Sequence, residues 1–222
     1  MQRKIAVFDV DNTIVDGFTE KIFAQYLFWR GQFPPGLFID LLFWFIKYKL
    51  NFKVDLVGIR RKMFSLFGGH GVAEVAEIFS RCFSEKIKPR IFPEAIRRIR
   101  KHQEMGYEIV LISASLEPLI LELRGFLGVK YSIATKLSVV NGYYDGNVEG
   151  EIIYGGNKVY ALTAFAEANG FTFSGSYVYC DHISDLPVME ICEHPIAINP
   201  GKQLKKIAEE RRWEVVKISR NE

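Results

Sequence analysis

Cysteine is scarce in this chain of 222 residues, and it forms no paired motif. The three cysteines (Cys82, Cys180 and Cys192) are odd in number and include no CxxC pair. This pattern excludes a disulfide scaffold and gives no zinc site. The N-terminus also lacks an apolar stretch followed by a small-residue cleavage site. We therefore expect a cytoplasmic protein in a reducing compartment.

An excess of charge of one sign is also lacking. The formal net charge of +3 is too small to indicate a nucleic-acid partner. A basic cluster at residues 97–101 alternates with Ile96 and Ile99 at helical spacing, which is typical of a solvated helix face. We expect no binding to nucleic acid.

No apolar run is long enough to span a membrane. The longest candidate, residues 37–46 (LFIDLLFWFI), is interrupted by Asp40 and followed by Lys47 and Lys49. A span needs roughly 20 apolar residues, and this run offers about half that number. Two interpretations stay open, a buried helix and a helix that lies on a membrane surface.

What the chain does contain is typical of a soluble globular protein, since 49% of its residues are hydrophobic and 25% are charged. Residues 4–10 (KIAVFDV) have the β-branched and aromatic character of a buried strand. From residue 19 to about residue 91 the apolar positions follow helical spacing instead, with no convincing strand. The change of pattern predicts an α/β domain that is interrupted by an all-helical segment.

Strand and helix patterns alternate along the rest of the chain. We expect strands at 108–112, 176–180, 195–199 and 214–218, and helices at 93–103, 117–127, 158–169, 185–192 and 202–212. One or two hairpins are expected between 136 and 154, where Asn141-Gly142 and Asp145-Gly146 are turn signals. Such units predict a parallel sheet with helices on both faces. We assign residues 1–16 and 92–222 to the core and 17–91 to an inserted helical cap.

Side chains that can carry chemistry stand where the expected strands end. Asp9 and Asp11 come at the end of the first strand, Ser113 after the second, Asp181 and Asp185 after the third, and Lys158 opens a helix. Binding sites in open parallel sheets lie at the carboxyl ends of the strands, so these groups should converge. Taken singly, each has a plainer interpretation as a turn residue, a helix cap or a solvated side chain.

Carboxylates at close range raise each other's pKa strongly unless a cation lies among them. Oxygen ligands without sulfur or imidazole favour Mg²⁺ over zinc. An ammonium and a hydroxyl, from Lys158 and Ser113, are suited to an anionic oxygen. A metal, a phosphate and a carboxylate nucleophile together indicate phosphoryl transfer.

The motifs in this order resemble those of the haloacid dehalogenase (HAD) superfamily. They are hhhhDxDxT at residues 5–13, the serine after IVLI, the lysine Lys158 and DxxxD at residues 181–185. The helical insertion after the first motif, and the late run AINPGKQLKKIAEERRWEV, resemble the phosphoserine phosphatase-like branch, subfamily IB. The resemblance covers essentially the whole chain. It implies a Rossmann-like core with a parallel sheet and a C1-type cap.

The resemblance also implies a role for each motif residue. Asp9 would attack phosphorus and become an aspartyl phosphate, while Asp11 would protonate the leaving alkoxide and then deprotonate a water. Ser113 and Lys158 would hold the phosphoryl oxygens together with Asn12 and Thr13, and Thr13 would also fix the loop. Mg²⁺ would be bound by Asp9, the backbone carbonyl of Asp11 and Asp181, with Asp185 supporting the metal directly or through a water. A dehalogenase needs neither a proton donor nor a metal, so this set favours a phosphatase.

The cap is expected to select the substrate. The branch places a glutamate shortly after the first motif, where this chain has Phe18, with Glu20 two residues further on. An aromatic ring there can offer an ammonium group only a cation–π contact, which puts phosphoserine in doubt. The branch also uses a cap arginine, and Arg61, or its neighbour Arg60, is the nearest match. The cap is rich in aromatic residues, which either pack its own core or face an acyl chain: Phe23, Tyr26, Phe28, Trp29, Phe33, Phe38, Phe43, Trp44, Phe45 and Tyr48.

We therefore expect an Mg²⁺-dependent phosphatase that acts on a small phosphorylated metabolite similar to phosphoserine. The alternatives are a phosphatase for phosphatidylglycerophosphate or lysophosphatidate, a phosphotransferase and a non-catalytic phosphate-binding module. Contact of the aromatic cap with a membrane surface stays open, as does the oligomeric state.

Overall fold

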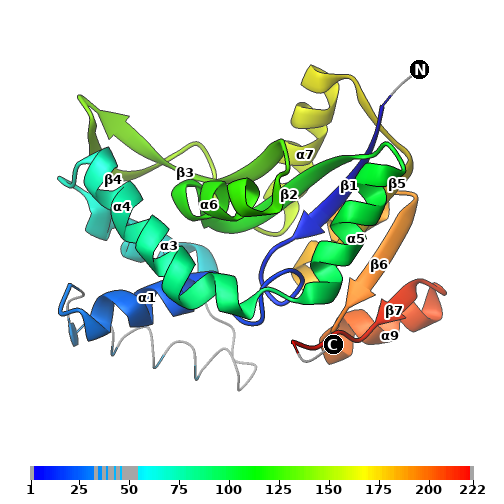
Figure 1. Ribbon diagram of the computed structural model, residues 1–222, viewed down its shortest axis with the longest axis horizontal. Helices are drawn as coiled ribbons and strands as arrows, with labels where there is room; N and C mark the ends of the chain where they lie inside the picture. The colour runs from blue at the N-terminus through cyan, green and yellow to red at the C-terminus, as the bar shows by residue number, and fades with distance from the viewer. Residues whose placement is uncertain are drawn as a thin grey trace.

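The computed structural model describes residues 3–32 and 55–220, together with positions 35, 36, 39, 43 and 46. Its centre is a seven-stranded sheet in the order β4-β3-β2-β1-β5-β6-β7 (Figure 1). The strands are β1 (Arg3–Asp9), β2 (Glu108–Leu116), β3 (Tyr131–Val140), β4 (Tyr143–Glu149), β5 (Phe171–Cys180), β6 (His194–Ile198) and β7 (Glu214–Val216). Neighbouring strands are parallel except for the antiparallel pair β3–β4. The prediction of an α/β fold with a mostly parallel sheet is confirmed.

Strand β1 lies in the middle of the sheet and is buried on both faces. Ile5 and Val7 point into one hydrophobic cluster, and Ala6 and Phe8 point into the other, as the period of two in a strand requires. The strand pairs in parallel with β2 on one side and β5 on the other. Its last residue, Asp9, therefore lies at the centre of the carboxyl edge of the sheet, where a parallel fold places its binding site.

Helices cover both faces of the sheet, as expected. The helices α5 (Pro93–Glu104) and α6 (Glu117–Leu127) pack on the face that contains Phe8. The opposite face is covered by α7 (Gly156–Asn169), α8 (Leu186–Ile191) and α9 (Lys202–Glu210). In Figure 1, α5 and α6 lie in front of the sheet and α7 lies behind it.

The segment between β1 and α5 contains α1 (Thr19–Trp29), α3 (Leu56–Phe64) and α4 (Val72–Cys82), with short helical turns at Ser65–Phe67, Phe83–Ile87 and Lys88–Arg90. Aromatic side chains pack its interior, since Phe23 stacks on Phe79 with ring centroids 4.1 Å apart. Over its described residues the segment forms isolated bridges but no strand. Most of the apolar run 37–46, and Phe33, Phe38, Trp44, Phe45 and Tyr48, lie outside the described residues. The exact boundaries of the cap remain a prediction.

Of the one or two hairpins expected between 136 and 154, one is present, formed by β3 and β4. Its turn is at Asn141-Gly142, as predicted, but the second predicted turn at Asp145-Gly146 is wrong because both residues lie inside β4. Gly146 allows β4 to pass close to the backbone of Ser65, because a Cβ atom on Gly146 would lie only 3.2 Å from the carbonyl oxygen of Ser65. Gly69 N–H donates to the carbonyl of Tyr144 at 2.7 Å nearby. The hairpin is thereby joined to the inserted segment.

Two strands are longer than the sequence pattern predicts. Strand β2 continues to Leu116, so Ser113 lies within it and not after it, because residues 113–116 remain buried and Leu116 still aligns with Thr135 of β3. Strand β5 begins at Phe171, with an irregular register between its two halves.

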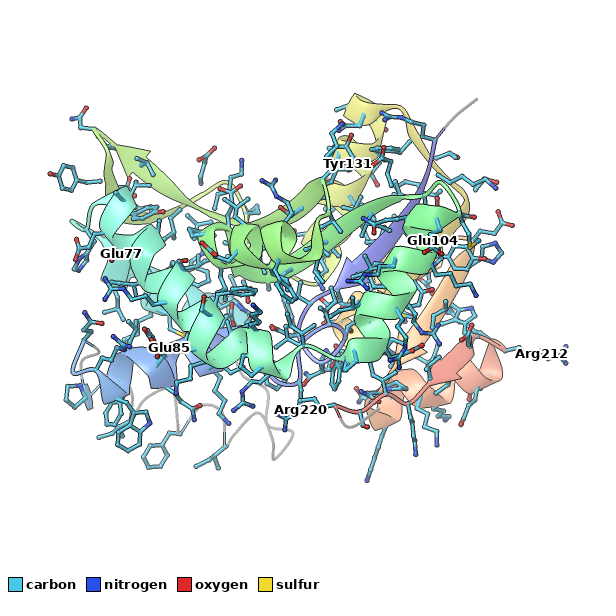
Figure 2. All side chains as sticks on the ribbon, viewed as in Figure 1. Glu77, Glu85, Glu104, Tyr131, Arg212 and Arg220 are labelled. Carbon is cyan, nitrogen blue, oxygen red and sulfur yellow. The ribbon has the colours of Figure 1, made fainter. Side chains whose placement is uncertain are left out.

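The end of the described chain returns to the loop that follows β1. Arg220, labelled in Figure 2, forms an ion pair with Asp16 at 2.8 Å. Across the described parts of the chain, no helix combines the length and the apolar character that crossing a bilayer requires.

Candidate active site

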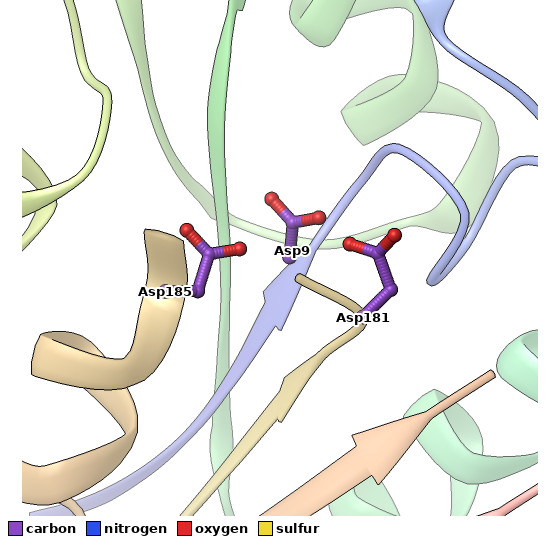
Figure 3. Close-up of side chains that lie close together, drawn as sticks. All are labelled: Asp9, Asp181 and Asp185. Carbon is purple, nitrogen blue, oxygen red and sulfur yellow. The ribbon is translucent and has the colours of Figure 1, made fainter. Parts of the chain in front are cut away.

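Three carboxylates meet at the carboxyl edge of the sheet. Asp9 ends β1, Asp181 directly follows β5, and Asp185 immediately precedes α8. One carboxylate oxygen from each lies within 4.8 Å of the others. Figure 3 shows the three side chains extending from separate segments toward a shared space. Residues that are up to 176 positions apart in the sequence are thus brought together by the pairing of β1 with β5.

Lys158, in the first turn of α7, supplies the positive charge at this cluster. Its Nζ lies 2.6 Å from Oδ1 of Asp9 and 2.8 Å from Oδ1 of Asp185. All three side chains are almost completely buried. Burial disfavours the ammonium, but the carboxylates of Asp185 and Asp9 outweigh it and raise the pKa of Lys158 well above its usual value.

A single ammonium does not compensate the three acids. Burial, followed by the charges of Asp185 and Asp11, raises the pKa of Asp9 to about 7 despite the opposing effect of Lys158. Burial, with Asp9 and Asp185 nearby, also raises the pKa of Asp181 well above its usual value. Carboxyl groups in this state lack a counter-charge, which a divalent cation would supply.

The donor set fits such a cation. All candidate ligands are carboxylate oxygens, which suit Mg²⁺. Oδ1 of Asp185 is buried, and its close contact is the ammonium of Lys158 at 2.8 Å. Carboxylate oxygens of all three acids thus lie close enough together to share one cation.

The loop after β1 turns back sharply beside Asp9. Asn12 adopts a left-handed conformation with φ of 56°, which asparagine tolerates better than most residues, and its N–H donates to Val15 at 2.7 Å. The hydroxyl of Thr13 is buried and has no hydrogen-bond partner among the described residues. The predicted site residues of this loop thus lie within a compact turn next to the carboxylates.

Asp11 extends from the same loop to the start of α1. Its Oδ1 accepts the backbone N–H of Thr19 at 2.8 Å and the Thr19 hydroxyl at 2.6 Å. Burial raises the pKa of Asp11 to about 6, and the negative charge of Glu20 adds to this effect. A pKa near neutrality suits a group that must both give and take a proton.

Ser113 is buried within β2, and its Oγ accepts the backbone N–H of Ser115 at 3.1 Å. The Ser113 hydroxyl hydrogen is therefore left to donate to another acceptor, such as a phosphoryl oxygen. The sequence pattern did not identify Ser115 and Thr19, whose hydroxyl oxygens are 2.5 Å apart. The Ser-x-Ser spacing at the end of a strand could have indicated Ser115. Thr19 has no sequence feature that indicates a site residue, apart from its position at a helix start.

The two predicted arginines have different surroundings. Arg60 Nε donates to both oxygens of Glu20, at 2.8 and 3.0 Å, and its guanidinium lies 4.8 Å from the ring centroid of Tyr154. This pair is mostly buried, and the charge of Arg60 is close enough to influence Asp11. Arg61 instead forms an ion pair with Glu151 at 3.6 Å, on the surface. Phe18 is half-buried and precedes the first residue of α1.

Comparisons with known proteins identify similar sequences among phosphatases. The chain is 30% identical to the probable phosphatase Rv3661 of Mycobacterium tuberculosis over 98% of this chain and 76% of that protein. It is 29% identical to the phosphoserine phosphatase SerB1 of the same organism over 95% of this chain and 69% of that protein. It is also 27% identical to a histidinol-phosphatase of Neisseria meningitidis, over 96% of this chain and 98% of that protein.

A solved structure has the same fold. A protein of unknown function from Bordetella pertussis superposes with a TM-score of 0.88, at 25% identity, over 97% of this chain and 99% of that one. The model of the haloacid dehalogenase-like hydrolases matches residues 6–190, a range that includes every carboxylate of the cluster. The chain belongs to the haloacid dehalogenase-like hydrolase family, and it is a phosphatase of that family.

Proposed function

We propose that this phosphatase hydrolyses a phosphomonoester through an aspartyl phosphate on Asp9, with Mg²⁺ at the three-carboxylate cluster. The observation that carries the proposal is the arrangement of Asp9, Asp181 and Asp185 around Lys158 at the carboxyl edge of the sheet. A buried carboxylate beside an ammonium and a candidate metal site has the charge environment that an in-line attack on phosphorus requires.

The reaction would proceed in two steps. An oxygen of Asp9 attacks phosphorus, the bond from phosphorus to the leaving oxygen breaks, and Asp11 gives its proton to that oxygen. Asp11 then takes a proton from a water that attacks the phosphorus of the aspartyl phosphate and restores Asp9. Ser113 and Lys158 hold the phosphoryl oxygens and stabilise their developing charge. When bound, Mg²⁺ would neutralise the carboxylates and the phosphoryl oxygens.

We further propose that the substrate is a small phosphorylated metabolite with a polar leaving alcohol, similar to phosphoserine. Relatives of comparable identity are named for phosphoserine and for histidinol phosphate, so similarity alone does not select one. Support for a polar alcohol comes from Arg60, whose Nη1 is buried without a hydrogen-bond partner among the described residues. Because Glu20 compensates the charge of Arg60, an added carboxylate on the substrate should gain little there.

Phosphate release from a substrate panel tests this function. The panel contains phosphoserine, histidinol phosphate, sugar phosphates, nucleotides and p-nitrophenyl phosphate, each with Mg²⁺ and with a chelator. Release that requires the metal and is lost in Asp9→Asn would support the proposal. Activity of Asp9→Asn equal to that of the wild type would rule out Asp9 as the nucleophile. Added alcohols test phosphoryl transfer, since a phosphotransferase would form new phosphate esters.

A lipid phosphate is a second candidate substrate, favoured by exposed apolar side chains in the inserted segment. Trp29 is 83% exposed, and Ile39, Phe43 and Ile46 are 53%, 63% and 46% exposed. The last three are spaced as on one helical face. Lysophosphatidate and phosphatidylglycerophosphate in vesicles test this candidate, with Phe43→Ser as the variant and exposed Tyr160→Ser in α7 as the control. Lipid turnover that Phe43→Ser leaves unchanged would argue against a role for this surface.

A further inference from the structure

Thr19 is the first residue of α1 and is nevertheless buried, with 1% of its surface exposed. The residue before it, Phe18, provides no side-chain hydrogen bond to cap the helix. Asp11 takes that place from the preceding loop, because its Oδ1 accepts the Thr19 N–H at 2.8 Å and the Thr19 hydroxyl at 2.6 Å. The helix N-terminus and the Asp11 side chain are therefore fixed by the same contacts.

The hydrogens in this cluster can be assigned by counting donors. Thr19 has one hydroxyl hydrogen, which it donates to Oδ1 of Asp11. The hydrogen in the 2.5 Å contact between Thr19 and Ser115 must then come from Ser115. Ser115 donates to Thr19 and Thr19 donates to Asp11, so the hydroxyl pair is ordered in one direction.

Both donors act on the same carboxyl oxygen of Asp11. An oxygen that already accepts two hydrogen bonds is the poorer site for a proton, so a proton on Asp11 resides on Oδ2. We propose that Thr19 is a positioning residue for the general acid, holding Oδ1 of Asp11 so that Oδ2 presents the transferable proton to the leaving oxygen. This inference rests on the proposed function of Asp11 as the general acid.

The proton balance of the step follows directly. When the bond between phosphorus and the leaving oxygen breaks, its electron pair stays on that oxygen, which takes the proton from Oδ2. Asp11 is then a carboxylate, and the two donors of Thr19 stabilise its new charge at Oδ1. In the second step Oδ2 takes a proton from the attacking water, which returns Asp11 to its starting state.

The matched variants are Thr19→Val, which keeps the shape and the N–H but removes the hydroxyl, and Thr19→Ser, which keeps the hydroxyl. The readout is kcat/KM for phosphate esters whose leaving groups range from p-nitrophenol, which departs without a proton, to simple alcohols, which need one. We expect Thr19→Val to lose about 10- to 100-fold with alkyl phosphates and less than about 3-fold with p-nitrophenyl phosphate. Thr19→Ser should remain within about 3-fold of wild type throughout.

A purely structural role predicts a different result, namely an equal loss with every leaving group in Thr19→Val. That outcome, or no loss at all, would overturn the inference. Ser115→Ala provides a second test that leaves Thr19 intact, and it should show a smaller loss with the same dependence on the leaving group. Asp11→Asn distinguishes a failure of this inference from a failure of the proposed function. If the loss of kcat/KM in Asp11→Asn does not depend on the leaving group, the proposed role of Asp11 itself is wrong.

Discussion

The charge state of Asp9, on which its role as a nucleophile depends, is determined by the neighbouring charged side chains. Burial, with the negative charges of Asp185 and Asp11, raises its pKa to about 7, although Lys158 lies 2.6 Å away and opposes the shift. We expect Asp9→Asn to lose at least roughly 10⁴-fold in kcat while it remains folded, because the amide is close to the carboxyl group in shape but cannot attack phosphorus. Phosphate release measures the activity, and circular dichroism measures whether the variant is folded. A folded Asp9→Asn variant with kcat close to wild type would contradict the assignment of Asp9 as nucleophile.

Ser113 should contribute through its free hydroxyl hydrogen. We expect Ser113→Ala to lower kcat by about 10²- to 10³-fold, the usual effect of removing one donor to a developing charge. Ser174→Ala, at an exposed position in β5, is the control and should be neutral. Steady-state kinetics with Mg²⁺ check both variants. A Ser113→Ala enzyme with unchanged kcat would show that another group holds the phosphoryl oxygen.

At this scale the sequence predicts some contacts and not others. Asp9, Asp181 and Lys158 could be placed at one site because each stands at the end or start of a regular element, and the topology of a parallel sheet brings those ends together. The contact of Thr19 with Ser115 joins residues 96 positions apart through side-chain hydroxyls. The spacing of apolar residues does not predict such a contact. Which of Arg60 and Arg61 faces the site likewise depends on the rotation of α3 about its axis, which the sequence does not specify.

Helix α6 allows the effect of backbone conformation on stability to be tested, because two glycines, one inside the helix and one at its end, have different conformations. Gly125 lies inside the helix, while Gly128 ends it in the left-handed region with φ of 65°. A Cβ atom would meet nothing within 4 Å at either position. We expect Gly125→Ala to raise the free energy of unfolding by about 0.5–1 kcal/mol and Gly128→Ala to lower it by about 1 kcal/mol. Denaturant titration measures both, and changes of the same sign would contradict this assignment.

Helix α3 tests the role of the pair between Arg60 and Glu20. Glu20→Gln removes the charge that compensates Arg60 but keeps the size of the side chain. We expect the variant to favour substrates with an added carboxylate by about 10-fold in relative kcat/KM, since about 1.4 kcal/mol of new attraction is enough for that change. Arg60→Gln should show no such gain. Equal preferences in the wild type and Glu20→Gln would place Arg60 outside the substrate site.

Most elements could be predicted because their patterns are strong. Helix α6 was expected with its observed bounds, and α5 and α7 within two residues. The failures lie where tertiary packing overrides a local signal. Asp145-Gly146 has the composition of a turn, but Gly146 is required where the hairpin approaches the backbone of Ser65. Ser113 was expected after β2, but the burial of residues 113–116 extends the strand.

At the scale of the whole molecule, metal and proton compete for the carboxylate cluster. Metal-free protein holds protons on Asp9, with a pKa of about 7, and on Asp181, with a pKa well above its usual value, which the unfolded chain releases near pH 4. The free energy of unfolding should therefore fall as the pH rises from about 4 to about 7, and the contribution of Asp9 should level off above its folded pKa. His102, with a pKa lowered to about 4, has the opposite effect only below about pH 6.5. Thermal unfolding in chelator should show a lower Tm at pH 7.5 than at pH 6.5, with a smaller difference in Asp181→Asn.

Magnesium should reverse this trend. A cation that binds only the folded state stabilises it by about 2.7 kcal/mol at a concentration 100 times the Kd. We expect Mg²⁺ to raise the Tm of the wild type, and to raise it more at pH 8, where fewer protons must be displaced. Asp181→Asn should lose most of this shift, whereas Glu104→Gln, at an exposed position of α5, should keep it. A shift that persists in Asp181→Asn would place the metal elsewhere.

The central place of β1 has a consequence for how the protein is made. The strand that carries Asp9 leaves the ribosome well before its two partners, which begin at Glu108 and Phe171. Translation at roughly 5–20 residues per second leaves the second edge of β1 unpaired for on the order of 10 s. During that time an apolar strand is exposed as a template for wrong pairing. The position that brings Asp9 to the centre of the sheet therefore leaves β1 open to wrong pairing during synthesis, a risk that a chaperone would reduce.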